Sequence, residues 1–244
     1  AGEGEGAVIV ARQQNAGRGR DGRSWESLPG ALLFSVLLRP SWPASHLPRL
    51  GFLACVAGAL TAEETGAPRA PLKWPNDLVF PITATSSAPH NTPGAPGGIL
   101  SWAKWGGILV ETGAAGQAAL WAVVGVGLNV GSLDVVPEDL RPPNATSLSD
   151  TLGRAVDPDL FLNRYLEHFK GLYDDSENGW DRALQGWRER DILLGQRVRA
   201  TSNGNPVEGA ARGINERGAL LLETVAGVIP IEVGDVHLEK AVMG

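Results

Sequence analysis

The segment AGRGRDGRSWES, residues 16–27, places three arginines and three glycines close together in a chain whose formal net charge is −6. An apolar β-type run at residues 7–11 leads directly into this arginine loop, so we expect a strand to deliver it. Its glycines spell G-x-G-x-x-G, which a dinucleotide-binding fold places at the start of a helix. Here residues 24–30 read as a loop before a second strand, and the expected downstream acidic residue is missing, so that interpretation fails.

What remains is the chemistry of Arg18, Arg20 and Arg23. Guanidinium groups form charge-assisted hydrogen bonds with phosphate, and glycines let the backbone approach a ligand closely. Because like charges repel one another when no anion is bound, we expect a loop that is mobile when empty and ordered when filled. On composition alone a solvated basic turn explains the segment equally well. A Walker A loop is excluded, because its G-x-x-x-x-G-K-[ST] pattern does not occur.

The composition is that of a globular protein, with 43% hydrophobic and 20% charged residues among 244. This length suits one large domain or two unequal domains. A single cysteine excludes an intramolecular disulfide framework, and no stretch is long and apolar enough to span a bilayer, so we expect a cytoplasmic protein. The acidic charge, without a helix-turn-helix or zinc-finger pattern, argues against a nucleic-acid partner, and the histidines lack zinc-ligand spacing.

Apolar periodicity predicts strands and helices that pack on one another. Strands are expected at residues 31–38, 107–111 and 120–130. A helix is expected at residues 47–65, another begins at Pro158 with Asp157 as its N-cap, and a third carries Trp180, Leu184 and Trp187 on one face. The side chains expected in the core include Cys55, Trp74, Trp102, Trp105 and Trp121.

From Gly195 the pattern changes to short alternating strands separated by turn signals. These signals are Asn203-Gly204, Glu208-Gly209, Arg217-Gly218, Ala226-Gly227 and Val233-Gly234. They predict a small all-β barrel of SH3 size and a domain boundary near Ile192. Residues 81–98 hold four prolines and, apart from His90, no titratable side chain, so we predict a flexible surface insertion there.

Five segments occur in the order in which the biotin protein ligases carry them. They are QNAGRGRDGRSW from Gln14, KWPND from Lys73, KWGGILVE from Lys104, VGVGLNV from Val124 and ATSL from Ala145. With a tail similar to the SH3-like C-terminal domain of these ligases, the chain resembles that family over almost its whole length. The resemblance implies an α/β (α+β) fold, with a mixed-sheet catalytic domain over residues 1–192 and an SH3-like barrel over residues 193–244.

The same resemblance implies a two-step reaction that uses ATP, Mg²⁺ and biotin. Biotin's carboxylate attacks the α-phosphorus of ATP to give biotinyl-5′-AMP and pyrophosphate. A lysine of the biotin carboxyl carrier domain of a carboxylase then accepts the biotin. Both steps develop negative charge on phosphate, so cations and positioning matter more than a protein nucleophile. A homodimer and the role of the small barrel are left open.

Carried over residue by residue, the resemblance assigns two binding sites and a metal contact. The biotin site comprises Gln14, Gly17, Arg18, Gly19, Arg20, Lys104, Gly107 and Leu109. The ATP site comprises Arg20, Arg23, Trp25, Lys73, Asn76 and Asn129. Asp77 would lie near the magnesium ion that bridges the phosphates. Lys104, Arg20 and Arg23 are the catalytic candidates, whereas Glu111 is interpreted as structural.

Two features depart from the family pattern. Upstream of the arginine loop, members carry a Ser/Thr-Asn motif that hydrogen-bonds biotin's ureido ring, and only AGEGEGAVIV precedes Ala11 here. Either the sequence is part of a longer chain or biotin binding is weakened. Asp21 also replaces a commonly basic position. Two alternatives to a biotin ligase therefore stay open: a lipoate- or octanoate-transferring enzyme, and a non-catalytic module that binds biotin or an adenylate.

Overall fold

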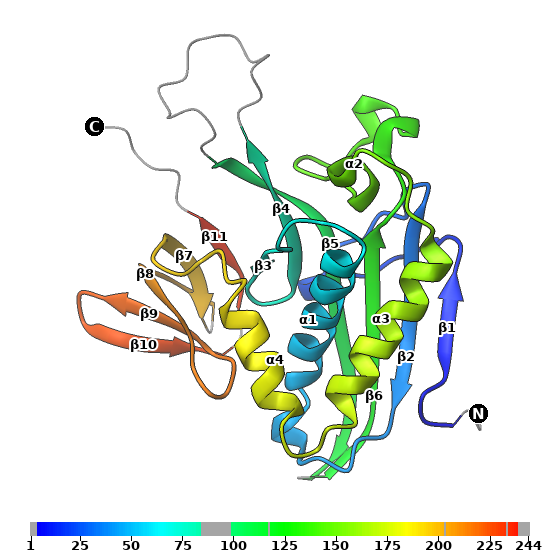
Figure 1. Cartoon of the computed structure of the whole chain (residues 1–244). Coiled ribbons are helices and arrows are strands. Elements are labelled where there is room, and N and C mark those ends of the chain that lie inside the picture. Colours follow the sequence, from blue (N-terminus) through cyan, green and yellow to red (C-terminus); the bar gives the residue numbers. More distant parts are fainter. Residues whose placement is uncertain (1–3, 84–98, 117, 203, 233, 239–244) are drawn as a thin grey trace, which may run out of the picture.

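The computed structural model describes residues 4–83, 99–116, 118–202, 204–232 and 234–238. A six-stranded sheet is covered on one face by helices, and a smaller five-stranded sheet lies beside it (Figure 1). The strands of the large sheet are β1 (Val8–Ala11), β2 (Ala31–Leu38), β3 (Leu72–Lys73), β4 (Asp77–Thr83), β5 (Ile99–Ala115) and β6 (Ala118–Asn129). Their order is β1-β2-β6-β5-β4-β3, so the predicted fold class is confirmed.

The ladders between these strands are antiparallel. Two isolated parallel bridges, Leu72–Asp191 and Lys104–Ala145, give the sheet its mixed character at the margins. The long β5–β6 hairpin forms the middle of the sheet. Strand β5 extends well beyond the predicted run at residues 107–111, whereas β6 closely matches the strand predicted at residues 120–130. These two strands provide a continuous platform for the arginine loop.

Strand β4 was not predicted, and its discovery corrects the predicted insertion at residues 81–98. Pro81, Ile82 and Thr83 continue β4 and pair with β5, so these three residues belong to the sheet and not to a flexible segment. Residues 84–98 lie outside the described residues. Proline lacks a backbone N–H and is found at edges and irregularities of sheets, which is why its presence argued against a strand.

Four α-helices accompany the described part of the large sheet. They are α1 (Arg49–Glu64), α2 (Leu148–Leu152), α3 (Pro158–Tyr173) and α4 (Gly179–Arg188). The predicted N-cap of α3 is confirmed, because the Asp157 carboxylate accepts hydrogen bonds from the Asp159 and Leu160 amides at 2.8 and 3.2 Å. The short α2 was missed, although Ser147 caps it in the same way at Asp150.

Helix α1 lies at the centre of the core. Its residues are buried on nearly every side, because α1 packs against the sheet, α3 and α4 together. The approach to the sheet is close at Gly58, where a Cβ atom would lie 2.7 Å from Leu78. The Tyr165 hydroxyl of α3 donates a hydrogen bond to the Ala54 carbonyl at 3.0 Å, which fixes the two helices in register. Cys55 is fully buried here, as predicted.

The prediction for the tryptophans is correct for Trp74 and Trp105, which are buried, and Trp102 is partly buried against the core. It is wrong for Trp121, which is 40% exposed. The Trp121 indole lies across Gly113 on the neighbouring strand, where a Cβ atom would come within 2.3 Å of its Nε1. In the described residues, no helix combines the length and apolar character needed to cross a membrane.

The small sheet has the order β10-β9-β8-β7-β11, and all of its ladders are antiparallel. Its strands are β7 (Arg197–Ser202), β8 (Asn205–Ile214), β9 (Leu220–Thr224), β10 (Gly227–Ile231) and β11 (Val236–Leu238). The turn predicted at Glu208-Gly209 is wrong, because both residues lie inside β8. Gly209 instead allows close strand approach, since a Cβ atom there would lie 2.5 Å from the Glu223 carbonyl oxygen.

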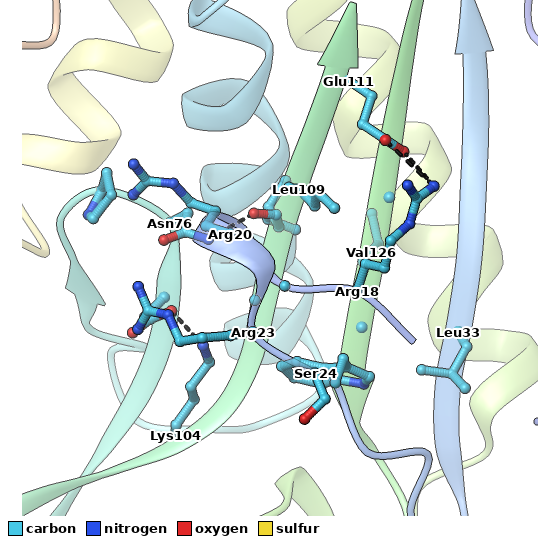
Figure 2. A pocket seen from close by; sticks show the side chains of 18 of the residues that line it. Arg18, Arg20, Arg23, Ser24, Leu33, Asn76, Lys104, Leu109, Glu111 and Val126 are labelled. Atoms are coloured by element: carbon cyan, nitrogen blue, oxygen red, sulfur yellow. Dashed lines mark hydrogen bonds and ion pairs between the residues drawn. The ribbon is translucent and has the colours of Figure 1, made fainter. Parts of the chain in front are cut away.

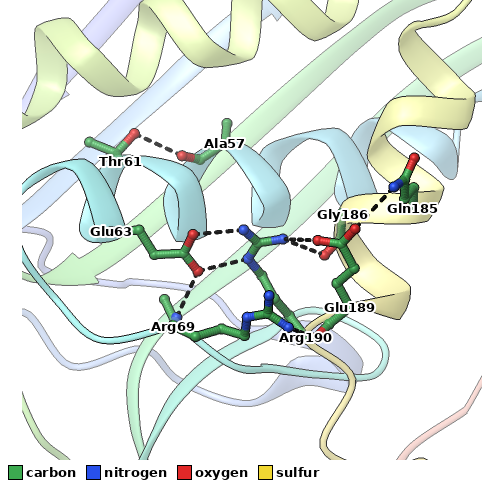
Figure 3. Close-up of polar contacts among 9 residues, drawn as sticks. Ala57, Thr61, Glu63, Arg69, Gln185, Gly186, Glu189 and Arg190 are labelled. Atoms are coloured by element: carbon green, nitrogen blue, oxygen red, sulfur yellow. Dashed lines mark hydrogen bonds and ion pairs between the residues drawn. The ribbon is translucent and has the colours of Figure 1, made fainter.

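The segment between α4 and the small sheet is tied to the large sheet by backbone and side-chain bonds. The Leu72 amide donates to the Arg190 carbonyl at 2.9 Å, and the Ile192 amide donates to the Leu72 carbonyl at 3.1 Å. The buried Arg190 guanidinium also holds both carboxylate oxygens of Glu63 on α1, at 2.9 and 2.7 Å (Figure 3). Nearby, the Trp74 indole donates to the Gly218 carbonyl at 3.0 Å. The small sheet is thereby fixed next to β3.

Candidate active site

A cavity of about 500 Å³ lies between the arginine loop and strands β2, β5 and β6, with the helices behind the sheet (Figure 2). It brings together most of the predicted site residues: Gln14, Arg18, Gly19, Arg20, Arg23, Trp25, Lys73, Asn76, Asp77, Lys104, Gly107 and Leu109. Three segments that are separate in the sequence, residues 14–25, 73–77 and 104–109, therefore meet at one place.

The arginine loop folds back on itself as a narrow hairpin. The Trp25 amide donates to the Gly17 carbonyl at 2.9 Å, and the Gly19 amide donates to the Arg23 carbonyl at 2.7 Å. Gly17 does not line the cavity; a Cβ atom there would lie 2.3 Å from the Trp25 carbonyl oxygen, so glycine is needed to close the hairpin. At the tip, Asp21 adopts a positive φ of 54°, a conformation that aspartate tolerates better than most residues.

Each arginine of the loop has an acceptor within the chain. Arg18 reaches across to Glu111 on β5, with 3.3 Å between Nη2 and Oε1, while Arg20 and Arg23 lie on the other side of the loop (Figure 2). Arg23 pairs with Asp21 and Asp235, and Arg20 donates to the Gly234 carbonyl at 3.3 Å. These acceptors offset the repulsion that the sequence led us to expect, so the empty loop has partners of its own.

The floor of the cavity is made of glycines on β5 and β6, and Trp25 covers part of it. A Cβ atom on Gly127 would lie 2.6 Å from the Trp25 indole, and one on Gly107 would lie 3.3 Å from it. The Lys104 ammonium lies 5.4 Å from the centre of the indole ring, within the range of a cation–π interaction. The Trp25 Nε1 is buried without a partner among the described residues, so a ligand here could satisfy it.

Two lysines and Asp77 lie close together on one polar wall of the cavity. Lys104 lies inside β5 rather than before it, and its ammonium donates to the Asp77 carboxylate at 2.5 Å. Lys73, on β3, is largely enclosed, and burial lowers its pKa, while the nearby Asp77 carboxylate acts in the opposite direction. A bound anion would compensate for this burial. The wall is thus able to hold negative charge at low desolvation cost.

The two predicted asparagines have different positions. The Asn76 amide donates to the Ile108 carbonyl at 2.7 Å, so at the cavity wall it secures the start of the apolar part of β5. Asn129 does not line this cavity. It is buried at the end of β6, where its amide donates to the Thr146 carbonyl at 3.1 Å and its Oδ1 has no partner among the described residues. The structure therefore does not place Asn129 with the other predicted site residues.

The small sheet and the residues that lead into it contribute cavity residues that no sequence pattern indicated. Asp235 and His237 line the cavity together with Ser35 and Gly125 of the large sheet. The Arg23 guanidinium keeps the pKa of the Asp235 carboxyl below its usual value, against the opposing effect of burial. The hydrogen bond with Asp235 in turn raises the pKa of Arg23. No local pattern identifies Asp235, because its partner is distant in sequence.

In the part of the chain that is described, no group of three or more His, Cys, Asp or Glu side chains could hold a metal ion. Asp77 is the predicted magnesium contact, and its carboxylate is hydrogen-bonded by Lys104. Magnesium at nucleotide sites is commonly held by one or two carboxylates together with phosphate oxygens. The acidic group present therefore fits an ion that arrives with a nucleotide, rather than one held by protein ligands alone.

The cavity has glycines in its floor on an antiparallel sheet and cationic side chains around it, a combination that suits a ligand carrying negative charge. The chain belongs to the biotin/lipoate A/B protein ligase family, whose model matches residues 3–129. A second model, the biotin protein ligase C terminal domain, matches residues 193–238. Within the family, the chain thus groups with the biotin protein ligases.

Individual relatives agree with this assignment. The chain is 31% identical to the bifunctional ligase/repressor BirA of Bacillus subtilis over 96% of its own length, and spans 66% of the length of that relative. It is 33% identical to the biotin--[acetyl-CoA-carboxylase] ligase of Mycobacterium tuberculosis, covering 96% of this chain and 80% of the relative. The biotin protein ligase of Aquifex aeolicus, solved with biotin and ATP, is 26% identical with a TM-score of 0.75, covering 99% of this chain and 92% of that one.

Proposed function

We propose that the chain is an ATP-dependent biotin protein ligase, which forms biotinyl-5′-AMP and transfers the biotin to a lysine of a carboxylase carrier domain. The observation that supports this most strongly is that Arg18, Arg20, Arg23 and Lys104 surround one cavity with a glycine floor. The similarity to relatives named as biotin ligases points the same way. We further propose a cytoplasmic location, and a catalytic domain of residues 1–192 followed by a small domain of residues 193–244.

In the proposed first step, the chain aligns biotin with the α-phosphorus of ATP. Gln14, Arg18 and the backbone around Gly19 hold biotin over Gly107 and Leu109. Lys104 exchanges its contact with Asp77 for the biotin carboxylate and for the charge that develops on the phosphate. Both reactants are charged, so a fixed ammonium at this point lowers their mutual repulsion and stabilises the transition state.

The nucleotide side of the cavity supplies the remaining cations. Arg20 and Arg23 contact the phosphates, so the leaving pyrophosphate is stabilised by guanidinium groups. Trp25 offers an aromatic face to the adenine, and Lys73 and Asn76 complete this wall. We leave Asn129 as a proposed nucleotide contact that would require a change in position, since it lies outside the cavity.

A magnesium ion bound with ATP would neutralise part of the phosphate charge, and Asp77 is the residue that would hold it. In the second step the acceptor lysine attacks the acyl carbonyl of the adenylate and AMP leaves. The chain's contribution there is to keep water away from the mixed anhydride, which the closed arginine loop does by covering the cavity.

The experiment that tests the proposal is ATP–pyrophosphate exchange with purified protein. Exchange that requires biotin supports a biotin ligase. Exchange that requires lipoate or octanoate instead would replace it with the acyltransferase alternative, and exchange with none of these acids would leave a non-catalytic binding module. A carrier domain with its lysine intact, compared with a lysine-to-arginine carrier, then tests the transfer step.

A substitution of Lys104 tests its assigned role. Lys104→Ala should reduce biotin-dependent exchange by orders of magnitude, because the transition-state charge loses its ammonium partner. The side chain is 40% exposed and adds little to the core, so the circular dichroism spectrum should match that of the unmodified protein. Near-normal exchange by this variant would remove Lys104 from the mechanism.

A further inference from the structure

The small sheet contributes an acidic residue to the wall of the cavity, next to the arginine loop. We propose that Asp235 is a positioning residue, which orients Arg23 toward the nucleotide phosphates. The inference rests on the proposed function, because it assigns a role in ATP binding at the same site. It gives the small sheet a part in that site that is exerted through Arg23.

Two arginines of the loop are bonded to two consecutive residues, Gly234 and Asp235, just before β11. The Arg23 Nη2 is ion-paired with the Asp235 carboxylate, and the Arg20 Nη1 donates to the Gly234 carbonyl at 3.3 Å. Both arginines also line the cavity, as do Asp235 and the two residues after it. Two of the three arginines in the loop are therefore held by the turn that enters β11.

This turn is itself fixed by its contact with β7. A Cβ atom on Gly234 would lie 1.8 Å from the Thr201 carbonyl oxygen, so no other residue fits without moving the backbone. The Thr201 amide donates to the Asp235 carbonyl at 3.0 Å, and β11 continues from there as an antiparallel partner of β7. The Asp235 carboxylate is consequently presented from a rigid support.

Arg23 can bind Asp235 and a phosphate at the same time. Its contacts with Asp235 and Asp21 both use Nη2. Among the described residues, Nε and Nη1 have no recorded acceptor, so they remain available to a ligand. The Arg23 side chain is 56% exposed and long, and without an anchor it would lose rotamer entropy on binding phosphate. Asp235 has already restricted that freedom. Asp235 therefore positions Arg23 for phosphate and does not compete with phosphate for the guanidinium group.

The test compares two ways of removing the anchor, neither of which alters Arg23. Asp235→Ala deletes the carboxylate, whereas Gly234→Ala keeps it and displaces the turn. Each variant should raise the dissociation constant for ATP, measured by calorimetry, and the KM for ATP in exchange by about tenfold, as loss of a restrained arginine predicts. The KM for biotin and the kcat at saturating ATP should stay within about twofold. Asp235→Asn, which keeps an acceptor oxygen, should fall between.

Glu216→Gln is the matched control. Glu216 pairs with Arg188 on α4 at 2.7 Å, so this substitution removes a different contact between the small sheet and the rest of the chain. It should leave ATP binding unchanged. An unchanged or lower dissociation constant for ATP in Asp235→Ala would overturn the inference, as would an equal rise in Glu216→Gln. Absence of biotin-dependent exchange in the unmodified protein would instead overturn the proposed function, while calorimetry with ATP would still decide the role of Asp235.

Discussion

Replacement of Asp191 by asparagine should stabilise the protein in a pH-dependent manner. Asp191 lies between α4 and the small sheet, and its Oδ1 accepts a hydrogen bond from the Leu193 amide at 2.8 Å. Its Oδ2 is buried and has no partner among the described residues. Burial raises the pKa of this carboxyl from 3.8 to about 6, and the Leu193 hydrogen bond only partly opposes that shift.

The sign follows from proton binding. The folded-state pKa lies above the unfolded-state value, so the folded protein holds the proton more tightly and its stability falls as the pH rises from about 3.8 to about 6. The full cost applies above that window. A shift from 3.8 to about 6, at 1.36 kcal/mol per unit, corresponds to about 3 kcal/mol. Asparagine is nearly isosteric with the protonated acid and avoids this cost.

The assay is urea unfolding of both proteins at two pH values. We expect Asp191→Asn to gain about 3 kcal/mol in the free energy of unfolding at pH 8 and about half of that at pH 5. The midpoint of the transition should shift accordingly, with an unchanged slope. A gain of equal size at both pH values, or no gain at pH 8, would refute the reasoning from the buried carboxylate.

Three further changes probe the fold and the loop. Glu63→Gln should lower the free energy of unfolding by about 3 kcal/mol, because Arg190, whose side chain is 6% exposed, loses its bidentate partner. Gly127→Ala should weaken ATP and biotin binding in calorimetry, since the new Cβ atom would displace the Trp25 indole. Biotin and ATP together should slow tryptic cleavage within residues 17–25, as expected if the loop orders around its ligand.

Each of these changes has a control or an opposite outcome. Glu167→Gln removes an exposed ion pair with Arg164 and should cost under about 0.5 kcal/mol. Gly171→Ala adds a methyl group in open space on α3, so it should leave ligand binding unchanged. Cleavage of the loop at the same rate with and without ligands would contradict closure. Equal losses of stability in Glu167→Gln and Glu63→Gln would contradict the role assigned to Arg190.

Local signals were sufficient for much of the fold. The helix that begins at Pro158 has its N-cap, its first-turn proline and its apolar face in one short segment, so its start could be predicted to the residue. Strand β2 is an uninterrupted apolar run, and it has the predicted bounds. In both cases the physical cause of the element lies within the segment itself.

The rest depends on contacts between distant segments. Gly209 looks like a turn residue, but it serves the approach of β8 to β9, which no short window contains. Asp235 and Arg23 are more than 200 positions apart, and nothing near either residue indicates the other. The resemblance located the loop and the lysines, whereas the acidic acceptors of its arginines became visible only when the sheets were in place.

The backbone bonds that join Leu72 to residues 190 and 192 have a practical consequence for protein engineering. A chimera that takes its C-terminal portion from a relative, starting at residue 192, would separate the two residues that bond to Leu72 on β3. In such a hybrid the side chains that pack around these bonds, next to Lys73 and Asp77, would come from two different parents. Grafts should therefore carry Leu72 and the 189–193 segment as one unit, taken from the same parent.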